Sequence, residues 1–470
     1  MALSMDASVN DRANLFSRLG CSLYLMLFLG ISYKPHIPIE KHMMATLVQR
    51  ENDEFTFQVT VRIGGTMLEM EAAIQDAVND LGRSATGEAL QHFDTDGSPI
   101  TLGSIKWTAR SRDGNTYQTP YGPVHIERYV YQTSRGGRIY CPLEHQARII
   151  RDATPRFAGQ LSHKYGQLNA RAVQTDLEQN HGRKVATSYI QNVAEWVGGI
   201  AGAKEELWDY ELPALDADIT TIVISLDGAM IPMADSSGYR EAMVGALSLY
   251  DGQGERQHTL YLAAAPEYGK AEFKQRMEGE IARLKQQFPE ALYLGIADGA
   301  ATNWAFLEQH TEQQLIDFFH ASEYLAKIAR AAHPQAKAKA KREHWQSEHC
   351  SRLKHQPDAV TTLIDEAIQL SERRTLSRQV REDLDSALTY FANHRHQMDY
   401  ARYVADGLPI GSGVTEAACK TLVKQRLCAS GMRWKNAGAK IVLSLRALSQ
   451  TTGRWTQFWQ RIDQFGAECC

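Results

Sequence analysis

The chain has 470 residues, of which 43% are hydrophobic and 23% are charged, so it is long enough for roughly two to four domains with buried cores. Its formal net charge of −4 excludes a protein that is basic throughout, and any surface for a polyanion must therefore be a local patch. The seven cysteines include no CxxC pair, which argues against a zinc ribbon or finger and is typical of a reducing, cytoplasmic setting.

Residues 1–65 are not assigned to a domain. Their apolar run, residues 21–31, is too short to span a bilayer, so we expect no membrane insertion. Arg12 and Arg18 precede this run as in a signal peptide, but no small-residue cleavage site follows it. We expect instead that Met43 or Met44 is the start and that the preceding residues are upstream sequence, with a signal peptide as the alternative.

Residues 66–145 predict an amphipathic helix followed by a small antiparallel β region. Apolar residues recur at helical spacing between residues 66 and 93, which indicates a helix used for packing or dimerisation. From residue 103 to 140 short alternating runs are separated by turn residues such as Asp113-Gly114, which predicts strands. Nothing in this region specifies a chemistry.

Residues 146–210 predict a helix-turn-helix, a motif of DNA-binding domains. Residues 170–178 and 185–197 have helical patterns, and Gly182 lies in the turn between them. A plain helical hairpin explains this short pattern equally well. In the DNA-binding interpretation the exposed face of the motif presents polar side chains to a major groove, namely Arg183, Lys184, Thr187, Ser188, Gln191 and Asn192.

A mixed α/β sheet is predicted for residues 211–332 and continues in residues 405–460. Apolar runs at residues 219–226 and 291–297 each end in Asp-Gly. Residues 333–404 are helical, polar and strand-free, and they interrupt the sheet domain as an all-helical insertion. Further strands are expected at residues 241–250, 258–263 and 314–320, and helices at residues 271–287 and from residue 322.

Two aspartates occupy equivalent places in this predicted sheet. Asp227 and Asp298 each directly follow an apolar strand and precede a glycine. Either one alone is more often a turn former. Together they indicate a shared crevice, because open sheets place their sites at the carboxyl ends of neighbouring strands.

A third acid, Glu416, is the only one between residues 411 and 460. It follows the turn Gly411-Ser412-Gly413 on a predicted helix for which Ser412 and Thr415 are candidate N-caps. A local pair with a lysine is the ordinary explanation, and a metal-binding carboxylate beside a polyanion-binding surface is the other. With the two aspartates, Glu416 would complete a set of oxygen ligands suited to Mg²⁺ or Mn²⁺. The basic residues of the stretch are Lys420, Lys424, Arg426, Arg433, Lys435, Lys440, Arg446 and Arg454.

Several short stretches match a known family. Around the candidate acids they are Ser225-Leu226-Asp227-Gly228, Ile296-Ala297-Asp298-Gly299, Asp317-Phe318-Phe319-His320 and Gly411-Ser412-Gly413-Val414-Thr415-Glu416. Elsewhere they are Glu88-Ala89-Leu90, Tyr121-Gly122-Pro123-Val124, Tyr140-Cys141-Pro142-Leu143-Glu144 and Met432-Arg433-Trp434. The chain thereby resembles the DDE transposases of bacterial insertion sequences, and more closely their ISKra group, a relative of the mutator-like transposases. The resemblance covers roughly residues 66–460.

The resemblance implies an RNase H-like core, interrupted by the helical insertion, whose catalytic and metal-binding residues are Asp227, Asp298 and Glu416. It implies Mg²⁺ or Mn²⁺ as the cofactor, two ions per active site. Asp317 and His320 match an auxiliary DxxH motif of the mutator-like relatives, with an ordinary core histidine as the alternative for His320. The enzyme would hydrolyse the phosphodiester at each transposon end and join the released 3′-hydroxyl to target DNA.

The implied partners are transposon ends and target DNA in the bacterial cytoplasm, at the nucleoid, bound by a homodimer or higher oligomer. The helix-turn-helix would read the terminal inverted repeats, and Trp434 or Trp345 could stack on an unpaired base, although packing is the more common role of a tryptophan. Phosphates near the site would be held by Lys420, Lys424, Arg426, Arg433 and Lys435.

Two other functions fit the same residues. A stand-alone metal-dependent nuclease on the same core would cut DNA without joining it. A DNA-binding regulator with a degenerate catalytic domain would only bind, and the intact set of three acids disfavours this function.

Overall fold

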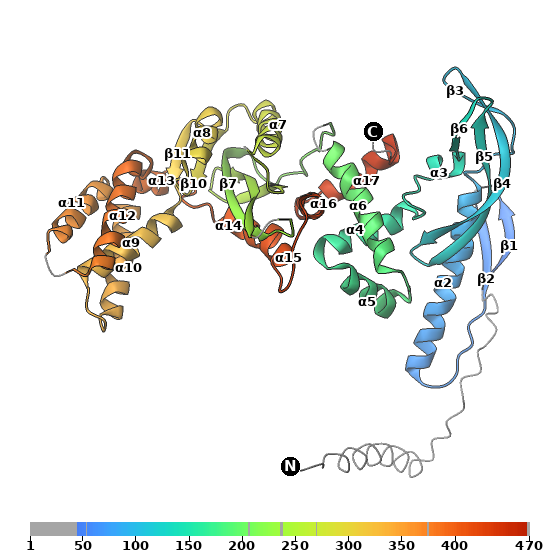
Figure 1. The fold of residues 1–470 in the computed structure, drawn as a ribbon, viewed down its shortest axis with the longest axis horizontal. Coiled ribbons are helices and arrows are strands. Elements are labelled where there is room, and N and C mark those ends of the chain that lie inside the picture. The colour runs from blue at the N-terminus through green and yellow to red at the C-terminus, as the bar shows by residue number, and fades with distance from the viewer. Residues whose placement is uncertain are drawn as a thin grey trace, which may run out of the picture.

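The computed structural model is a mixed α/β protein and describes residues 45–52, 54–204, 207–235, 238–268, 270–373 and 376–467. Figure 1 shows an N-terminal helix-and-sheet unit at one end, a bundle of helices at the other, and a second sheet with its helices between them. The apolar run at residues 21–31 and both candidate start methionines lie outside the described residues. Within those residues, no helix combines the length and the apolar character needed to cross a membrane.

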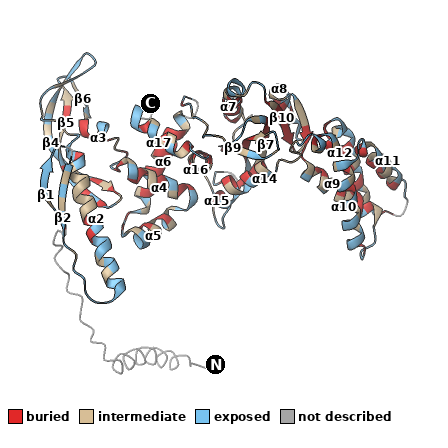
Figure 2. Cartoon of the chain, turned by 180° about the vertical axis from the view of Figure 1, so that it is seen from behind, coloured by how far each residue is buried: buried red, intermediate tan, exposed pale blue. Residues whose placement is uncertain are grey.

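The N-terminal unit packs one long helix, α2 (Met67–Gln91), against an antiparallel sheet of order β3-β4-β5-β6. The helix begins where Thr66 and Glu69 each accept a hydrogen bond from the other's backbone N–H. The half of α2 beyond the sheet is mostly exposed (Figure 2). The other elements are β1 (Ala45–Glu51), β2 (Glu54–Val59), β3 (Ile100–Leu102), β4 (Ile105–Thr119), β5 (Gly122–Thr133), β6 (Gly136–Tyr140) and α3 (Pro142–Gln146).

The prediction of a turn at Asp113-Gly114 is wrong. Both residues lie inside β4 and pair with Arg128 and Glu127 of β5. The chain reverses instead at Pro120-Tyr121, where Thr119 and Gly122 close the hairpin. Cross-strand pairing thus overrides the turn preference of the Asp-Gly dipeptide.

Three helices follow and share one buried core with the two C-terminal helices. α5 ends at Gly182, whose φ of 60° lies in the left-handed region that favours glycine. Buried apolar side chains of this core also come from one face of the second sheet, including Ala229, Ile231 and Val244. The helices are α4 (Pro155–Gln167), α5 (Ala170–His181), α6 (Thr187–Lys204), α16 (Asn436–Gln450) and α17 (Arg454–Phe465).

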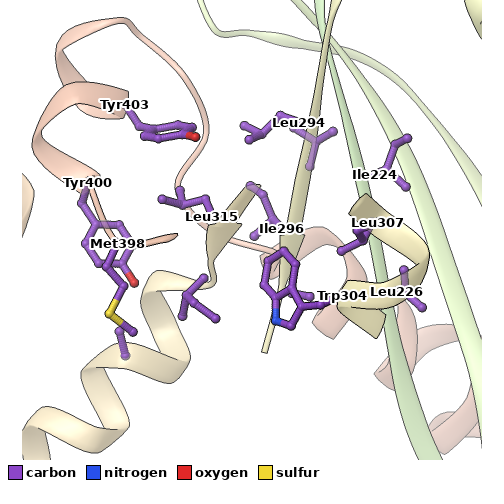
Figure 3. Close-up of a cluster of buried hydrophobic side chains, with 14 of the residues drawn as sticks. Ile224, Leu226, Leu294, Ile296, Trp304, Leu307, Leu315, Met398, Tyr400 and Tyr403 are labelled. Atoms are coloured by element: carbon purple, nitrogen blue, oxygen red, sulfur yellow. The ribbon is translucent and has the colours of Figure 1, made fainter. Parts of the chain in front are cut away.

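The second sheet has five strands in the order β11-β10-β7-β8-β9. The pairs β7–β8 and β8–β9 are antiparallel, whereas β10 runs parallel to both β7 and β11. Its other face packs on a second large core, part of which is shown in Figure 3. The elements are β7 (Ile219–Pro232), β8 (Tyr239–Asp251), β9 (Arg256–Ala264), α7 (Ala271–Gln287), β10 (Leu292–Ala297), α8 (Ala301–His310), β11 (Gln313–Ile316) and α9 (Phe318–Ala332).

The helical insertion shares this second core, because Leu363, Leu384 and Tyr400 are buried in the same cluster as Leu294 and Ile296 of the sheet. It comprises α10 (Lys339–His355), α11 (Ala359–Ser371), α12 (Arg378–His394), the 3₁₀ turn η1 (Arg395–Gln397) and α13 (Tyr400–Ala405). The chain then returns to the sheet through α14 (Gly413–Ala418), the π-helical segment η2 (Cys419–Lys424) and α15 (Gln425–Leu427).

The strand expected over residues 314–320 is shorter than its apolar run suggests. β11 ends at Ile316, and Phe318 already begins α9. The buried side chain of Asp317 accepts a hydrogen bond from the backbone N–H of Phe319, at 2.5 Å, and therefore caps the helix.

The expectation that Arg183 faces DNA is wrong, because the side chain is only 4% exposed. Its Nε donates to the carbonyl of Thr119 at 3.1 Å, and its Nη2 donates to Oε1 of Gln118 at 3.0 Å. The guanidinium also lies 5.0 Å from the ring centroid of Phe157. Arg183 thus ties the turn between α5 and α6 to the end of β4.

We predict that Arg183→Ala destabilises the fold, because hydrogen bonds that involve a charged group typically contribute about 1.5–3 kcal/mol. Denaturant titration should show this loss, whereas Lys184→Ala, at an exposed neighbouring position, should change the free energy of unfolding by less than about 0.5 kcal/mol. Equal stability of the two variants would contradict this role of Arg183.

Candidate active site

Parallel pairing of β7 and β10 brings two of the predicted acids to one edge of the sheet. The paired register of these strands ends at Ser225 and Ile296, and Asp227 and Asp298 each lie two residues further along the chain. Ile224, Leu226, Leu294 and Ile296, the side chains just before them, pack in the core beneath (Figure 3). The equivalent places in the sequence are therefore neighbouring places in the fold.

Asp227 is half-buried, and its environment favours the protonated form. Burial raises the pKa of this carboxyl, and the nearby charge of Asp298 raises it further. Opposing this, the backbone N–H of Gly228 donates to Oδ1 at 2.6 Å, and the Cys419 thiol donates to Oδ2 at 3.5 Å. Burial is the largest cause of the raised pKa, and the neighbouring charge of Asp298 is a smaller one.

Asp298 lies in the loop between β10 and α8. Its Oδ1 accepts from the backbone N–H of Ala300 at 3.1 Å, which orders the entry to α8. Gly299 has a φ of 106°, in the region that favours glycine, and a side chain there would meet His394 at 3.1 Å and Tyr390 at 3.3 Å. The loop that carries this acid is thus pressed against the helical insertion.

Tyr390 of α12 makes the most specific contact between the insertion and this loop. Its hydroxyl donates to the backbone carbonyl of Asp298 at 3.3 Å, and its ring stacks on Tyr324 of α9, with centroids 3.7 Å apart. Burial, together with the charges of Tyr324 and Asp298, raises the pKa of Tyr390, so its hydroxyl remains a donor at neutral pH. No pattern in the sequence indicates Tyr390, because its partner is a backbone atom.

Glu416 is brought to the same sheet by α14. The hydroxyls of Ser225 on β7 and Thr415 on α14 are hydrogen-bonded in the core, which fixes this helix against the strand that carries Asp227. Glu416 is 36% exposed and pairs with Lys420, at 2.9 Å from carboxylate to ammonium. The local pair considered from the sequence is therefore present, and it leaves the carboxylate accessible.

Asp317 fixes the turn that precedes Glu416. Its Oδ2 accepts from the backbone N–H of Ser412 at 2.7 Å and from the Ser412 hydroxyl. The N–H of Phe318 also donates to the carbonyl of Ile410, at 3.0 Å. Ser412 and Thr415 therefore do not act as side-chain N-caps of α14, because the first binds Asp317 and the second binds Ser225.

His320 stands one helical turn into α9, with its Nδ1 3.9 Å from Oδ1 of Asp317, which is too long for a hydrogen bond. This nitrogen is buried and has no hydrogen-bond partner within the described part of the chain. A positive charge on His320 lowers the pKa of Asp227, so the ring lies close enough to influence that acid electrostatically. The side chain of His320 is 31% exposed, so it is not enclosed in the hydrophobic core.

A groove of about 630 Å³ opens beside Glu416. One wall is the start of α9 with Phe319, and the opposite wall is α10 of the insertion with Gln346 and Lys354. The turn at Gly411 and Gly413 forms its floor, and a methyl group added at either glycine would meet no atom within 4 Å. Its volume is within the range of about 300–1,000 Å³ that is usual for ligand sites.

The helix after Glu416 is irregular, and a buried arginine compensates for it. In the π-helical segment η2 the hydrogen-bond pattern is shifted, a feature frequent at functional sites. Arg446 of α16 donates from Nε to the carbonyl of Leu422 at 2.8 Å, from Nη2 to the carbonyl of Thr421, and from Nη1 to the carbonyl of Gly166 at 2.7 Å. Arg446 therefore joins the helix of Glu416 to α4.

Of the expected DNA contacts, some are exposed and others are not. Arg426 is only 3% exposed, donates to the carbonyl of Tyr165 and lies 5.1 Å from the ring centroid of Trp434, so its expected role as a phosphate ligand is wrong. Trp434 is half-buried and donates from Nε1 to the carbonyl of Leu427 at 2.9 Å, while Trp345 stacks on His349 at 3.5 Å. The exposed candidates are Lys184, Ser188, Gln191, Lys420, Lys424, Arg433 and Lys435.

The donor types suit a hard divalent cation, because Asp227, Asp298 and Glu416 are all carboxylates, carried by β7, by the loop after its partner strand β10 and by α14, which is hydrogen-bonded to β7. Among the described residues, however, no group of three or more His, Cys, Asp or Glu side chains converges closely enough to form a ready-made metal site. Side-chain movement would have to complete it.

Neither a comparison with protein-family models nor one with curated proteins returns a match for this chain. Its function must therefore be argued from the residues and their geometry.

Because the folded-state pKa of Asp227 lies above its ordinary value, folding is favoured while this group is protonated. That contribution is complete below the unfolded pKa of about 3.9 and is lost as pH rises through the folded pKa. In metal-free buffer Asp227→Asn should therefore be more stable than the wild type at pH 7, and the difference should shrink towards pH 4. A difference that does not vary with pH in urea titrations would refute this.

If Asp227, Asp298 and Glu416 hold Mg²⁺, Tyr390→Phe should weaken its binding several-fold, because the loop of Asp298 loses its hydrogen bond to α12 while the ring stacking remains. The shift of the thermal midpoint with Mg²⁺ concentration measures this without any assay of activity. Tyr403→Phe is the matched control, since that hydroxyl interacts with Arg402 instead. Identical Mg²⁺ dependence in both variants would show that Tyr390 is merely structural.

Proposed function

We propose that this chain is a DDE transposase with an RNase H-like catalytic core, similar to the ISKra group of bacterial insertion sequences. The strand order supports this core, because three antiparallel strands, β9, β8 and β7, continue into two parallel ones, β10 and β11. The insertion lies between β11 with its following helix and the helix of Glu416, as in mutator-like relatives.

One observation carries the proposal. The register of β7 and β10 brings Asp227 and Asp298 together, and the hydrogen bond between Ser225 and Thr415 holds the helix of Glu416 against the same strand. The proposal rests on this shared attachment to β7 of three acids that are up to 189 positions apart in the sequence, with exposed Lys424 and Lys435 following on the chain.

Asp227, Asp298 and Glu416 would hold Mg²⁺ or Mn²⁺. When bound, these ions supply Lewis-acid activation of the attacking oxygen and stabilisation of the leaving oxygen in phosphodiester chemistry. Asp317 keeps the turn of Glu416 in place through Ser412, and Tyr390 does the same for the loop of Asp298. His320 would act with Asp317 as the auxiliary motif, and a positive charge on it would lower the pKa of Asp227. Lys420 neutralises Glu416 until the substrate and the cation arrive.

DNA binding would place the α5–α6 pair as a helix-turn-helix on the terminal inverted repeats, with Lys184, Ser188 and Gln191 as exposed contacts. In the free chain Gln191 already donates to Glu195 at 2.6 Å, so base contact by this residue requires that pair to open. Exposed Lys420, Lys424, Arg433 and Lys435 would bind phosphates. The active form on two transposon ends would be a homodimer or a higher oligomer.

Asp227→Asn, Asp298→Asn and Glu416→Gln should each reduce metal-dependent cleavage and joining at least a hundredfold while DNA binding persists. Each change keeps the size of the side chain and removes a charge that would hold the cation. The assay uses a duplex that bears the inverted repeat flanking the coding region, with Mg²⁺. Glu308→Gln, at an exposed carboxylate on α8, is the control and should behave as the wild type.

The products distinguish the alternatives. Joined strands support a transposase, cut strands without joining support a nuclease, and binding without cleavage supports a regulator. Near-wild-type cleavage by any one acid variant would remove that residue from the site.

A further inference from the structure

The far end of the N-terminal sheet is basic and contains no acid. Residues 99–112 and 128–140 include six basic residues but neither Asp nor Glu. One of the six, Arg128, is neutralised by Glu144 at 3.0 Å. The other five are exposed and are called here the basic sheet end, namely Lys106, Arg110, Arg112, Arg135 and Arg138.

Strand pairing gathers these five side chains although they are spread along the sequence. Trp107 pairs with Thr133, and Thr133 pairs with Gly136, so Lys106 lies next to the β5–β6 turn that carries Arg135. Arg110 is the extra residue of a bulge between Ala109 and Ser111 in β4. This end of the sheet projects beyond the rest of the molecule, near the labels β3 and β6 in Figure 1.

The charges of the basic sheet end are not used inside the described part of the chain. There, none of its five side chains has a hydrogen-bond or ion-pair partner, and the one ring contact is that of Arg112 with Tyr129, at 5.5 Å. Carboxylates lie near Arg112, because Asp113 follows it and Asp94 accepts from the backbone N–H of its strand partner Tyr129, at 3.2 Å. Exposed like charges on neighbouring strands repel one another, and a bound polyanion would relieve that repulsion.

We infer that the basic sheet end binds the sugar–phosphate backbone of duplex DNA, as a surface separate from the α5–α6 pair and from the three acids. Side chains two positions apart on a strand are about 6.7 Å apart, twice the axial step of about 3.4 Å between phosphates of one DNA strand. β4 and β5 form a long two-stranded ribbon, an element that can enter a DNA groove.

An anionic membrane is a poorer match for this surface. Membrane-surface binding usually needs a continuous apolar face beside the cations. Here the exposed large apolar residues are the paired Leu102 and Ile105 on β3 and β4, at 40% and 52% exposure, and Ile139 on β6, at 53%. Three such side chains do not form a continuous face, and they are compatible with contact to a groove wall.

The basic sheet end and the second helix of the α5–α6 pair are held in one unit. Arg183 in the turn of that pair bonds Gln118 and Thr119 at the near end of β4, and Asn79 of α2 donates to the carbonyl of His181 at 3.3 Å. A duplex bound by α6 could therefore be contacted by the sheet without reorganisation of the chain. The inference extends the proposed function, yet it requires only DNA binding and no catalysis.

The test measures binding of the full chain to a random-sequence DNA duplex over a range of salt concentrations. Lys106→Ala/Arg110→Ala and Arg135→Ala/Arg138→Ala should each weaken binding several-fold and flatten the slope of log K against log salt by about 1–2, since each lost phosphate contact removes about 0.9. The control is Lys337→Ala/Lys341→Ala, which removes the same charge from exposed positions before and in α10. Far-ultraviolet circular dichroism checks that all variants fold.

The inference would be overturned if the slope of log K against log salt in both sheet variants equalled that of the wild type. It would also be overturned if the control variant lost as much of this slope as the sheet variants do. Loss of binding to anionic vesicles but not to DNA would also overturn it and would assign the surface to a membrane. A different result would contradict the proposed function alone. In that case the chain would show no metal-dependent cleavage, while the salt dependence of its DNA binding would still change with these substitutions.

Discussion

The buried carboxylate of Asp317 joins two parts of the chain that the helical insertion separates. Asp317 stands between β11 and α9, before the insertion, and Ser412 follows the insertion by a few residues. Their hydrogen bonds, with that from Phe318 to Ile410, close a loop of 95 positions. Because the entropic cost of closing a loop grows only slowly with its length, an inserted bundle is tolerated as long as this junction forms. The placement of Glu416 depends on the same junction.

The features that the sequence predicts correctly are those that local patterns determine. The strand β10 that ends just before Asp298-Gly299, its neighbour β7, the helix α7 and the strand-free insertion follow from hydrophobic periodicity and turn residues. The expectation that the first strand ends before Asp227-Gly228 is wrong, because both residues pair with β8 and β7 continues to Pro232. Asp113-Gly114 and residues 318–320 depart from the prediction because pairing with β5 and the cap by Asp317 outweigh local preference. Tyr390 and the partners of Ser412 and Thr415 are not predictable, since their contacts reach across 92 to 190 positions.

Counts of charged residues are a weak guide to charged surfaces. Arg426 and Arg446 belong to the most basic stretch of the sequence, yet both guanidiniums are buried and satisfy backbone carbonyls around Tyr165, Leu422 and Gly166. Arg183 does the same at the end of β4. Conversely, the basic sheet end is not apparent in the sequence because strand pairing assembles it from separate segments. The guanidinium of arginine carries five N–H donors in one plane, so it can bind buried backbone carbonyls as well as phosphates. Only the fold shows which of these two partners a given arginine has.

The three acids differ in what holds them. Asp227 lies in β7, between β8 and the end of β10, so the sheet alone fixes its backbone. The loop of Asp298 is held by Tyr390 of α12, and Glu416 borders a groove whose other wall is α10. The positions of the second and third acids relative to the first therefore depend on how the insertion packs. Since the insertion and the sheet share one continuous core, a shift of the insertion would reach both acids through packed side chains rather than through a linker.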